Sequence, residues 1–98
     1  MARFDFIATY MLANHKSGTI YVGSTSDLPS RLTQHRSGEG SKFTARYDVH
    51  RLVWFERHDL IVAAIHRERR LKTWSRRWKI ELIEKTNPDW RDLSVGLW

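Results

Sequence analysis

The sequence predicts a small α+β domain with the element order β-β-α-β-α-α. Residues 6–12 and 19–23 are short runs of apolar, aromatic and β-branched side chains, and residues 13–18 between them are mostly polar and end in Gly18. Two such runs joined by a short polar loop are typical of an antiparallel hairpin. A third strand-like run and three segments with helix stop signals accompany them. A chain of 98 residues supports one hydrophobic core, so we expect one domain over residues 1–98.

A tyrosine lies in each strand of the expected hairpin. Side chains alternate between the faces of a strand, so Tyr10 should share a face with Ala8 and Leu12, and Tyr21 should share a face with Gly23. The small neighbours, Ala8 and Gly23, are expected to leave room for a ligand to approach each phenol.

Residues 26–38 predict a short helix, because polar N-cap candidates and Pro29 open the segment and Gly38 ends it. At 100° per residue, Arg31 and His35 fall on the same side as two leucines, the side that should face the protein body. A Gly/Ser-containing loop is expected over residues 37–41. The basic and aromatic residues 42–47 indicate no definite structure.

Residues 51–56 predict the third strand, and two helices follow it. The first should run from residue 60 to about 73 with Asp59 as its cap, and the second from Ser75 to about residue 85.

An acidic residue interrupts the apolar stripe of the first of these two helices. The stripe consists of Ile61, Ala64, Ile65 and Leu71, and Glu68 lies inside it. A carboxylate facing a core is costly unless it is paired, protonated or bound to a cation. Glu68 is therefore a candidate functional residue.

The composition favours a polyanionic partner and excludes several other classes. The chain carries 17 Lys and Arg against 11 Asp and Glu, for a formal net charge of +6. Phosphate contacts would supply most of its affinity for nucleic acid. The absence of cysteine excludes disulfides and thiolate zinc sites and fits a reducing compartment. No signal peptide or membrane-spanning run is evident, so we expect a cytoplasmic protein without membrane contact.

Phosphodiester hydrolysis needs a base, positive charge on the phosphate oxygens and usually a divalent cation. Tyr10 or Tyr21 could be the base, and Arg31 could hold the phosphate. His35 could bond to a phenol or to the phosphate, and Glu68 could bind magnesium or manganese. A phenol with a pKa of about 10 needs nearby positive charge to act near neutrality.

Each of these residues also has a plain structural interpretation. A strand tyrosine is most often a half-buried packing residue. Arg31 and His35 could be solvated or cap carbonyls, and Glu68 could simply pair with Arg31. The functional interpretation gains weight because these rare placements occur together.

These residues resemble the GIY-YIG nuclease superfamily. Its two tyrosine motifs match residues 8–10 and 21–23, its helical arginine and histidine match Arg31 and His35, and its metal-binding glutamate matches Glu68. The chain is similar to the small stand-alone bacterial members, which are related to the amino-terminal nuclease domain of the excision-repair endonuclease.

The resemblance implies a three-stranded antiparallel sheet flanked by helices and a metal-dependent (Mg²⁺ or Mn²⁺) endonuclease acting on DNA. The implied roles are Tyr10 as base, Tyr21 as its partner or a phosphate ligand, Arg31 on the scissile phosphate, His35 bonded to a tyrosine, and Glu68 on the metal.

Three further expectations accompany the resemblance. Asn87 is the nearest match to an asparagine that contacts the site in this family, and Lys42 is expected to contact phosphate because of its charge and position. Ala8-Thr9 replaces the Gly-Ile of the first motif, which should add a methyl and a hydroxyl beside the site.

Two other function classes remain open from the sequence. One is a module that binds nucleic acid without cutting it, with Phe43, Tyr47 or Trp54 stacking on bases. The other is a partner-binding protein that keeps a nuclease scaffold without turnover. The sequence leaves open the strandedness of the substrate, DNA versus RNA, and the oligomeric state.

Overall fold

The fold is a three-stranded antiparallel sheet with helices on both faces, which confirms the predicted α+β class. The computed structural model describes residues 6–38 and 42–96, so part of the expected 37–41 loop lies outside the described residues. The elements in chain order are β1 (Ala8–Ala13), β2 (Ile20–Thr25), α1 (Leu28–Arg36), α2 (Lys42–Tyr47), β3 (Arg51–Arg57), α3 (Ile61–Thr73) and α4 (Arg76–Thr86).

The predicted hairpin is present as β1 and β2. Their antiparallel register sets Tyr10 opposite Gly23 and Leu12 opposite Tyr21. β1 is the central strand, since the order in the sheet is β2-β1-β3, and each of its residues is buried. β2 is therefore an edge strand, and functional groups from both faces of the sheet can meet along it.

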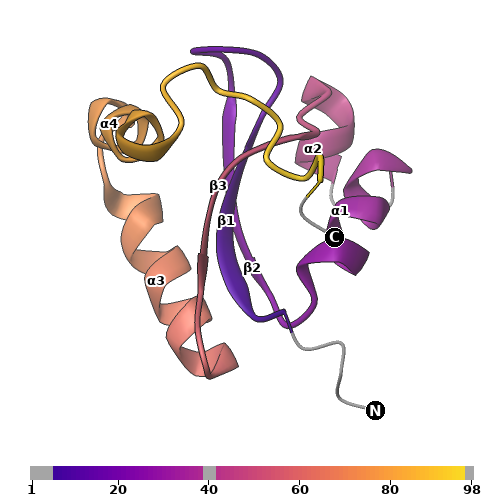
Figure 1. Ribbon diagram of the computed structural model, residues 1–98, viewed down its shortest axis with the longest axis vertical. Helices are drawn as coiled ribbons and strands as arrows, with labels where there is room; N and C mark the ends of the chain where they lie inside the picture. The colour runs from indigo at the N-terminus through magenta and orange to yellow at the C-terminus, as the bar shows by residue number, and fades with distance from the viewer. Residues whose placement is uncertain (1–5, 39–41, 97–98) are drawn as a thin grey trace.

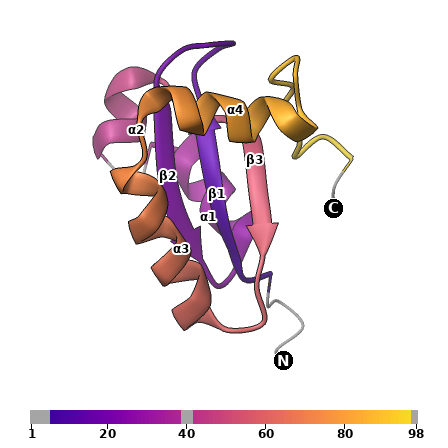
Figure 2. The same ribbon diagram turned by 90° about the vertical axis from the view of Figure 1, so that its left-hand side faces the viewer.

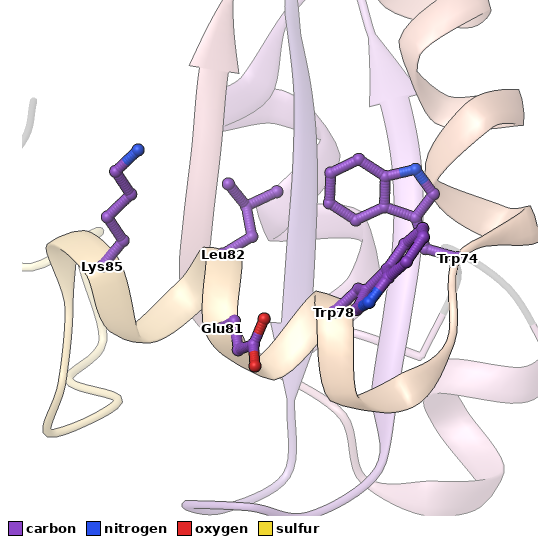
Figure 3. A pocket seen from close by; sticks show the side chains of 5 residues that line it. All are labelled: Trp74, Trp78, Glu81, Leu82 and Lys85. Atoms are coloured by element: carbon purple, nitrogen blue, oxygen red, sulfur yellow. The ribbon is translucent and has the colours of Figure 1, made fainter.

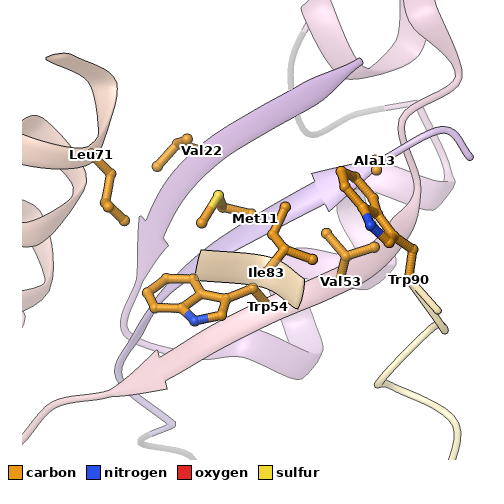
Figure 4. Close-up of a cluster of buried hydrophobic side chains, with 8 residues drawn as sticks. All are labelled: Met11, Ala13, Val22, Val53, Trp54, Leu71, Ile83 and Trp90. Carbon is orange, nitrogen blue, oxygen red and sulfur yellow. The ribbon is translucent and has the colours of Figure 1, made fainter. Parts of the chain in front are cut away.

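Two hydrophobic clusters hold the layers together. α1 and α2 lie on one side of the sheet, and α3 and α4 lie on the other (Figure 1). Figure 2 shows α3 running along β2 and α4 crossing the end of the sheet. The cluster beneath α3 and α4 is formed by Met11, Ala13, Val22, Val53, Trp54, Leu71, Ile83 and Trp90 (Figure 4). The cluster beneath α1 is formed by Ala8, Tyr10, Leu12, Leu28, Leu32, Val49 and Leu52.

The structure adds a helix that the predicted element order lacks. α2 covers residues 42–47, and the only residue that it buries is Thr44. A helix that buries a single polar side chain has no apolar stripe, so the sequence pattern does not predict it.

The helix caps agree only in part with those predicted. Ser75 caps α4 by accepting a hydrogen bond from the backbone N–H of Trp78. Asp59 does not cap α3, because the N-cap is Leu60, whose side chain makes no capping hydrogen bond.

Two of the four residues predicted to form the apolar stripe of α3 are buried, and two are not. Ala64 and Leu71 are buried, whereas Ile61 and Ile65 are each more than a third exposed. α3 contacts the sheet along β2 and β1, and this narrow contact covers only one side of the helix. Glu68 has a side chain that is 19% exposed, so it lies at the border of the buried stripe.

Over residues 6–38 and 42–96, no helix combines the length and apolar character needed to cross a membrane. The longest of them, α3, has 13 residues.

Candidate active site

A buried hydrogen-bonded chain links β1, α1 and α2 beneath the edge strand. The Tyr10 hydroxyl lies 2.9 Å from Nε2 of His35, and Nδ1 of His35 lies 3.0 Å from Oγ1 of Thr44. All three side chains belong to residues with 0% exposure. The implied hydrogen bond between His35 and a tyrosine is therefore present. The contact with His35 explains why Thr44, the one buried residue of α2, is polar.

Burial decides the charge state of both aromatic groups. Burial raises the pKa of Tyr10 above its usual value, with a further increase from Tyr21, while the Arg31 charge acts in the opposite direction. Burial also lowers the pKa of His35 from 6.5 to about 4, assisted by the charges of Arg31 and His50. Tyr10 and His35 are consequently both neutral near pH 7.

The space expected beside Tyr21, at Gly23, is filled by the phenol of Tyr10. A Cβ atom at Gly23 would lie 2.6 Å from the Tyr10 hydroxyl oxygen and 2.7 Å from Cζ of the same ring. Gly23 therefore admits the phenol of the neighbouring strand rather than a ligand. The expectation that a ligand could approach Tyr10 directly is wrong, because this residue is fully buried.

Gly23→Ala should destabilise the protein by about 1–3 kcal/mol, because the added methyl overlaps a ring that is packed on all sides. Urea unfolding followed by far-UV circular dichroism would measure the change. A variant within about 0.5 kcal/mol of the wild type would mean that the Tyr10 ring can move aside.

Tyr21 is the more accessible of the two tyrosines. Tyr21 is partly exposed. Its ring centroid lies 6.3 Å from that of Tyr10 and 5.3 Å from that of His35. Phe43 continues this aromatic group, with its centroid 6.0 Å from that of Tyr21. Tyr21 thus joins the buried chain to the surface.

The Arg31 guanidinium is partly buried and has no hydrogen-bond or ion-pair partner among the residues that the structure describes. Its charge acts on both Tyr10 and His35, so it lies near their rings. A half-buried cation is costly without a compensating anion. Such a group is well suited to an anionic ligand.

Glu68 approaches the same region from α3. Ser24 of β2 donates a hydrogen bond to its Oε1, and the ammonium group of Lys72 pairs with its Oε2. The carboxylate charge also raises the pKa of the Tyr10 phenol, so Glu68, Arg31 and Tyr21 all act electrostatically on that hydroxyl. Glu68 pairs with Lys72 rather than with Arg31, the partner considered from sequence.

The Glu68 region suits a divalent cation. Mg²⁺ prefers oxygen ligands and is commonly held by one or two carboxylates together with water and substrate phosphates. The Glu68 carboxylate and the Ser24 hydroxyl supply such oxygens. The carboxylate already binds one cationic group, the Lys72 ammonium. No group of three or more His, Cys, Asp or Glu side chains able to hold a metal occurs within residues 6–38 and 42–96. Substrate oxygens would therefore have to complete the site.

Thr9 lies opposite Ser24 in the β1–β2 register, on the face of the sheet that carries α3 and Glu68. Its hydroxyl donates to the carbonyl of Ala64 at 2.8 Å and lies 3.1 Å from Nε2 of His58. The hydroxyl that Thr9 was expected to add beside the site lies on the Glu68 side of the sheet, where it anchors β1 to α3. Its effect on the site stays a prediction.

Lys42 and Asn87 are the two remaining predicted residues. Lys42 is exposed at the first residue of α2, and its phosphate contact stays a prediction. Asn87 is 4% exposed, and its amide bonds to the backbone of Val53 and Arg91. Its nucleic-acid contact also stays a prediction, and the geometry gives it a structural role at the end of α4, beside β3.

Sequence reasoning missed Ser24, Thr44 and Lys72. Lys72 is four residues after Glu68, a spacing that favours ion pairs on a helix, so this pair could have been found. Ser24 and Thr44 gave no local signal, because each meets its partner only in the folded sheet.

Comparison with known proteins agrees with this geometry. The family model described as the GIY-YIG catalytic domain matches residues 6–81, from the residues before β1 into α4. The chain belongs to the GIY-YIG family. This membership assigns it to a nuclease superfamily.

Several GIY-YIG relatives carry the name UPF0213 protein. One from Staphylococcus saprophyticus is 36% identical over 70 residues, which cover 71% of this chain and 85% of the relative. Another from Haloquadratum walsbyi is 37% identical over 67 residues, covering 68% and 75% of the two chains. The solution NMR structure of a UPF0213 protein from Bacillus halodurans has a TM-score of 0.55 at 30% identity and covers 90% of this chain and 93% of that one.

Proposed function

We propose that this protein is a divalent-metal-dependent endonuclease that hydrolyses phosphodiester bonds in DNA. The observation that carries the proposal is the Arg31 guanidinium, which has no hydrogen-bond or ion-pair partner within residues 6–38 and 42–96 and whose charge acts, like those of Tyr21 and Glu68, on the Tyr10 phenol. A planar, two-pronged guanidinium matches two oxygens of a phosphate. We also propose the cytoplasm as its location, because a chain without cysteine fits a reducing compartment.

Tyr21 fits the role of general base better than Tyr10. The Tyr10 hydroxyl is fully buried and stays protonated, so it has no route to a water molecule. Tyr21 raises the pKa of Tyr10 further, and the two ring centroids lie 6.3 Å apart, so the two phenols are neighbours. If His35 donates to Tyr10 and Tyr10 donates to Tyr21, the Tyr21 oxygen is held as an acceptor, which a base must be. Tyr10 and His35 are then positioning residues.

In this scheme, Tyr21 acts as a phenolate: its own proton has gone to solvent, and its oxygen takes the proton of a water whose oxygen attacks phosphorus. Arg31 binds the phosphate oxygens, and the bond to the leaving oxygen breaks as that oxygen takes a proton from solvent. Glu68, assisted by Ser24, would hold Mg²⁺ or Mn²⁺. A bound divalent cation stabilises the negative charge that develops on the phosphate.

A groove next to Tyr21 gives the substrate a path. Its volume is about 280 Å³, and its lining consists of Ile20, Tyr21, Val22, Phe43, Lys72 and Lys79. The two lysines can contact phosphates, and the exposed Phe43 ring offers a surface for stacking. Apolar and cationic groups side by side suit a nucleotide better than an acidic peptide.

Incubation with labelled oligonucleotides tests the proposal. Single-stranded, duplex and forked DNA and an RNA of the same sequence would each be offered with magnesium, manganese or EDTA. We expect endonucleolytic cleavage of DNA with a divalent cation and none with EDTA. Binding of these oligonucleotides without cleavage in either metal would refute the proposal and favour a binding module.

Arg31→Lys should lower the cleavage rate at saturating substrate about tenfold or more, although the charge is kept. An ammonium cannot make the paired hydrogen bonds that a guanidinium makes to a phosphate. Arg36→Lys is a matched control, since Arg36 lies one residue after His35 on the same helix but pairs with Asp92. Equal rates for both variants and the wild type would mean that Arg31 belongs only to a diffuse basic surface.

A further inference from the structure

A second hollow lies outside the candidate active site, at the junction of α3 and α4. It has a volume of about 370 Å³ and is lined by Trp74, Trp78, Glu81, Leu82 and Lys85. Figure 3 shows the two indole rings side by side at the start of α4, with Leu82 and Lys85 on the following turns. The volume lies within the range of small-ligand sites.

The exposed ring of Trp78 is the feature of this hollow that indicates a binding site. It is 56% exposed, an unusual state for the largest side chain in proteins. Its ring stands at 90° to that of Trp74, with centroids 5.8 Å apart, so together they form an aromatic corner. Trp74 already has a cation partner, because the Arg67 guanidinium lies 5.5 Å from its ring centroid. The Trp78 ring is left to face solvent.

The charge around this corner favours a polyanion over a cationic ligand. α4 carries four cationic side chains and two carboxylates. Glu81, which lines the hollow, pairs with Arg77, and Glu84 accepts a hydrogen bond from Trp90, so three cations (Arg76, Lys79 and Lys85) remain against one carboxylate. Lys85 stands at the hollow itself. A flat aromatic surface among cations is the arrangement on which nucleic-acid bases stack while phosphates contact the cations.

The hollow and the groove beside Tyr21 are lined by neighbouring residues of α4. Lys79 lines that groove and Trp78 lines the hollow, so consecutive residues of α4 face the two sites. We propose that the Trp74-Trp78 corner is a stacking site for an unpaired or terminal base of the bound nucleic acid, with Lys85 contacting a neighbouring phosphate. The inference rests on the proposed function, because it takes nucleic acid as the ligand.

The test measures binding of fluorescein-labelled oligothymidylates in EDTA by fluorescence anisotropy. Trp78→Ala should weaken binding of a strand of about 20 nucleotides roughly tenfold, which is the size of one lost base stack. A strand of about 4 nucleotides should lose less affinity, because fewer of its bases can reach the corner while it is bound beside Tyr21. Trp78→Phe should retain most of the affinity, and Lys85→Ala should reduce the salt dependence of binding.

Controls separate stacking from general damage. Val62→Ala removes another exposed apolar side chain, 72% exposed on α3, and should bind as the wild type does. Because Trp78 is largely exposed, its replacement should leave the melting temperature nearly unchanged. In cleavage assays the Trp78→Ala loss should fall on KM rather than on kcat.

Two outcomes would overturn the inference. One is wild-type affinity of Trp78→Ala for the long strand. The other is unchanged DNA binding accompanied by loss of self-association in sedimentation, which would assign the corner to a second copy of this chain. The proposed function can fail separately: if long strands bind through Trp78 but are never cut, only the nuclease activity is refuted.

Discussion

Glu68→Ala is expected to abolish cleavage in any divalent metal while DNA binding is kept or strengthened. Among the described residues, Glu68 supplies the one carboxylate that acts on the Tyr10 phenol, and the change removes its oxygens, the proposed ligands of the cation. It also removes a negative charge that repels phosphate and releases the Lys72 ammonium. Cleavage assays with magnesium and manganese and a gel shift in EDTA would measure the two effects.

The stability of this variant separates the metal-ligand role from a structural one. The Lys72 side chain is 53% exposed, and a pair with one such partner is worth about 0–1 kcal/mol. We therefore expect the free energy of unfolding of Glu68→Ala to lie within about 1 kcal/mol of the wild type. A loss of several kcal/mol, together with weakened DNA binding, would make Glu68 a structural residue.

Lys72→Ala is the matched control. It breaks the same ion pair but leaves the Glu68 carboxylate and its hydrogen bond from Ser24 in place. If the pair itself were the functional unit, the two variants would lose equal activity. Under our assignment, Lys72→Ala weakens binding in the groove beside Tyr21 and retains metal-dependent cleavage.

The strands and the longer helices were predictable because their signals are local. The alternation of the hairpin and the polar cap of Ser75 can each be detected within one short segment, and both are confirmed. α2 was missed because Thr44, the one residue that it buries, is recognised only through its contact with His35. Buried polar contacts between distant segments leave no periodic pattern.

The site was predictable in its residue types but less so in its geometry. Tyr10 and Tyr21 look equivalent in the sequence, since each lies within a strand beside a small residue. Their exposure differs because Tyr10 lies on the central strand and its phenol fills the space above Gly23, whereas Tyr21 lies on the edge strand. Strand order is a long-range property, so the residues alone left Tyr10 and Tyr21 both open as the base, and only the resemblance implied Tyr10.

This difference leads to an opposite pair of effects for the two tyrosines. Tyr21→Phe should lower the cleavage rate at saturating substrate by about a hundredfold or more, because it removes the proposed base. Its ring contacts with His35 and Phe43 are kept, so the free energy of unfolding should change little.

Tyr10→Phe should instead act mainly on stability. It leaves Nε2 of His35 without its hydrogen-bond partner in a fully buried position, which should cost about 1–3 kcal/mol. Its cleavage rate should fall less than that of Tyr21→Phe, because Tyr10 acts only by holding the Tyr21 oxygen. Single-turnover rates and urea unfolding of both variants would decide the assignment. A larger rate loss for Tyr10→Phe with unchanged stability would return the role of base to Tyr10 and require its buried hydroxyl to become accessible when substrate binds.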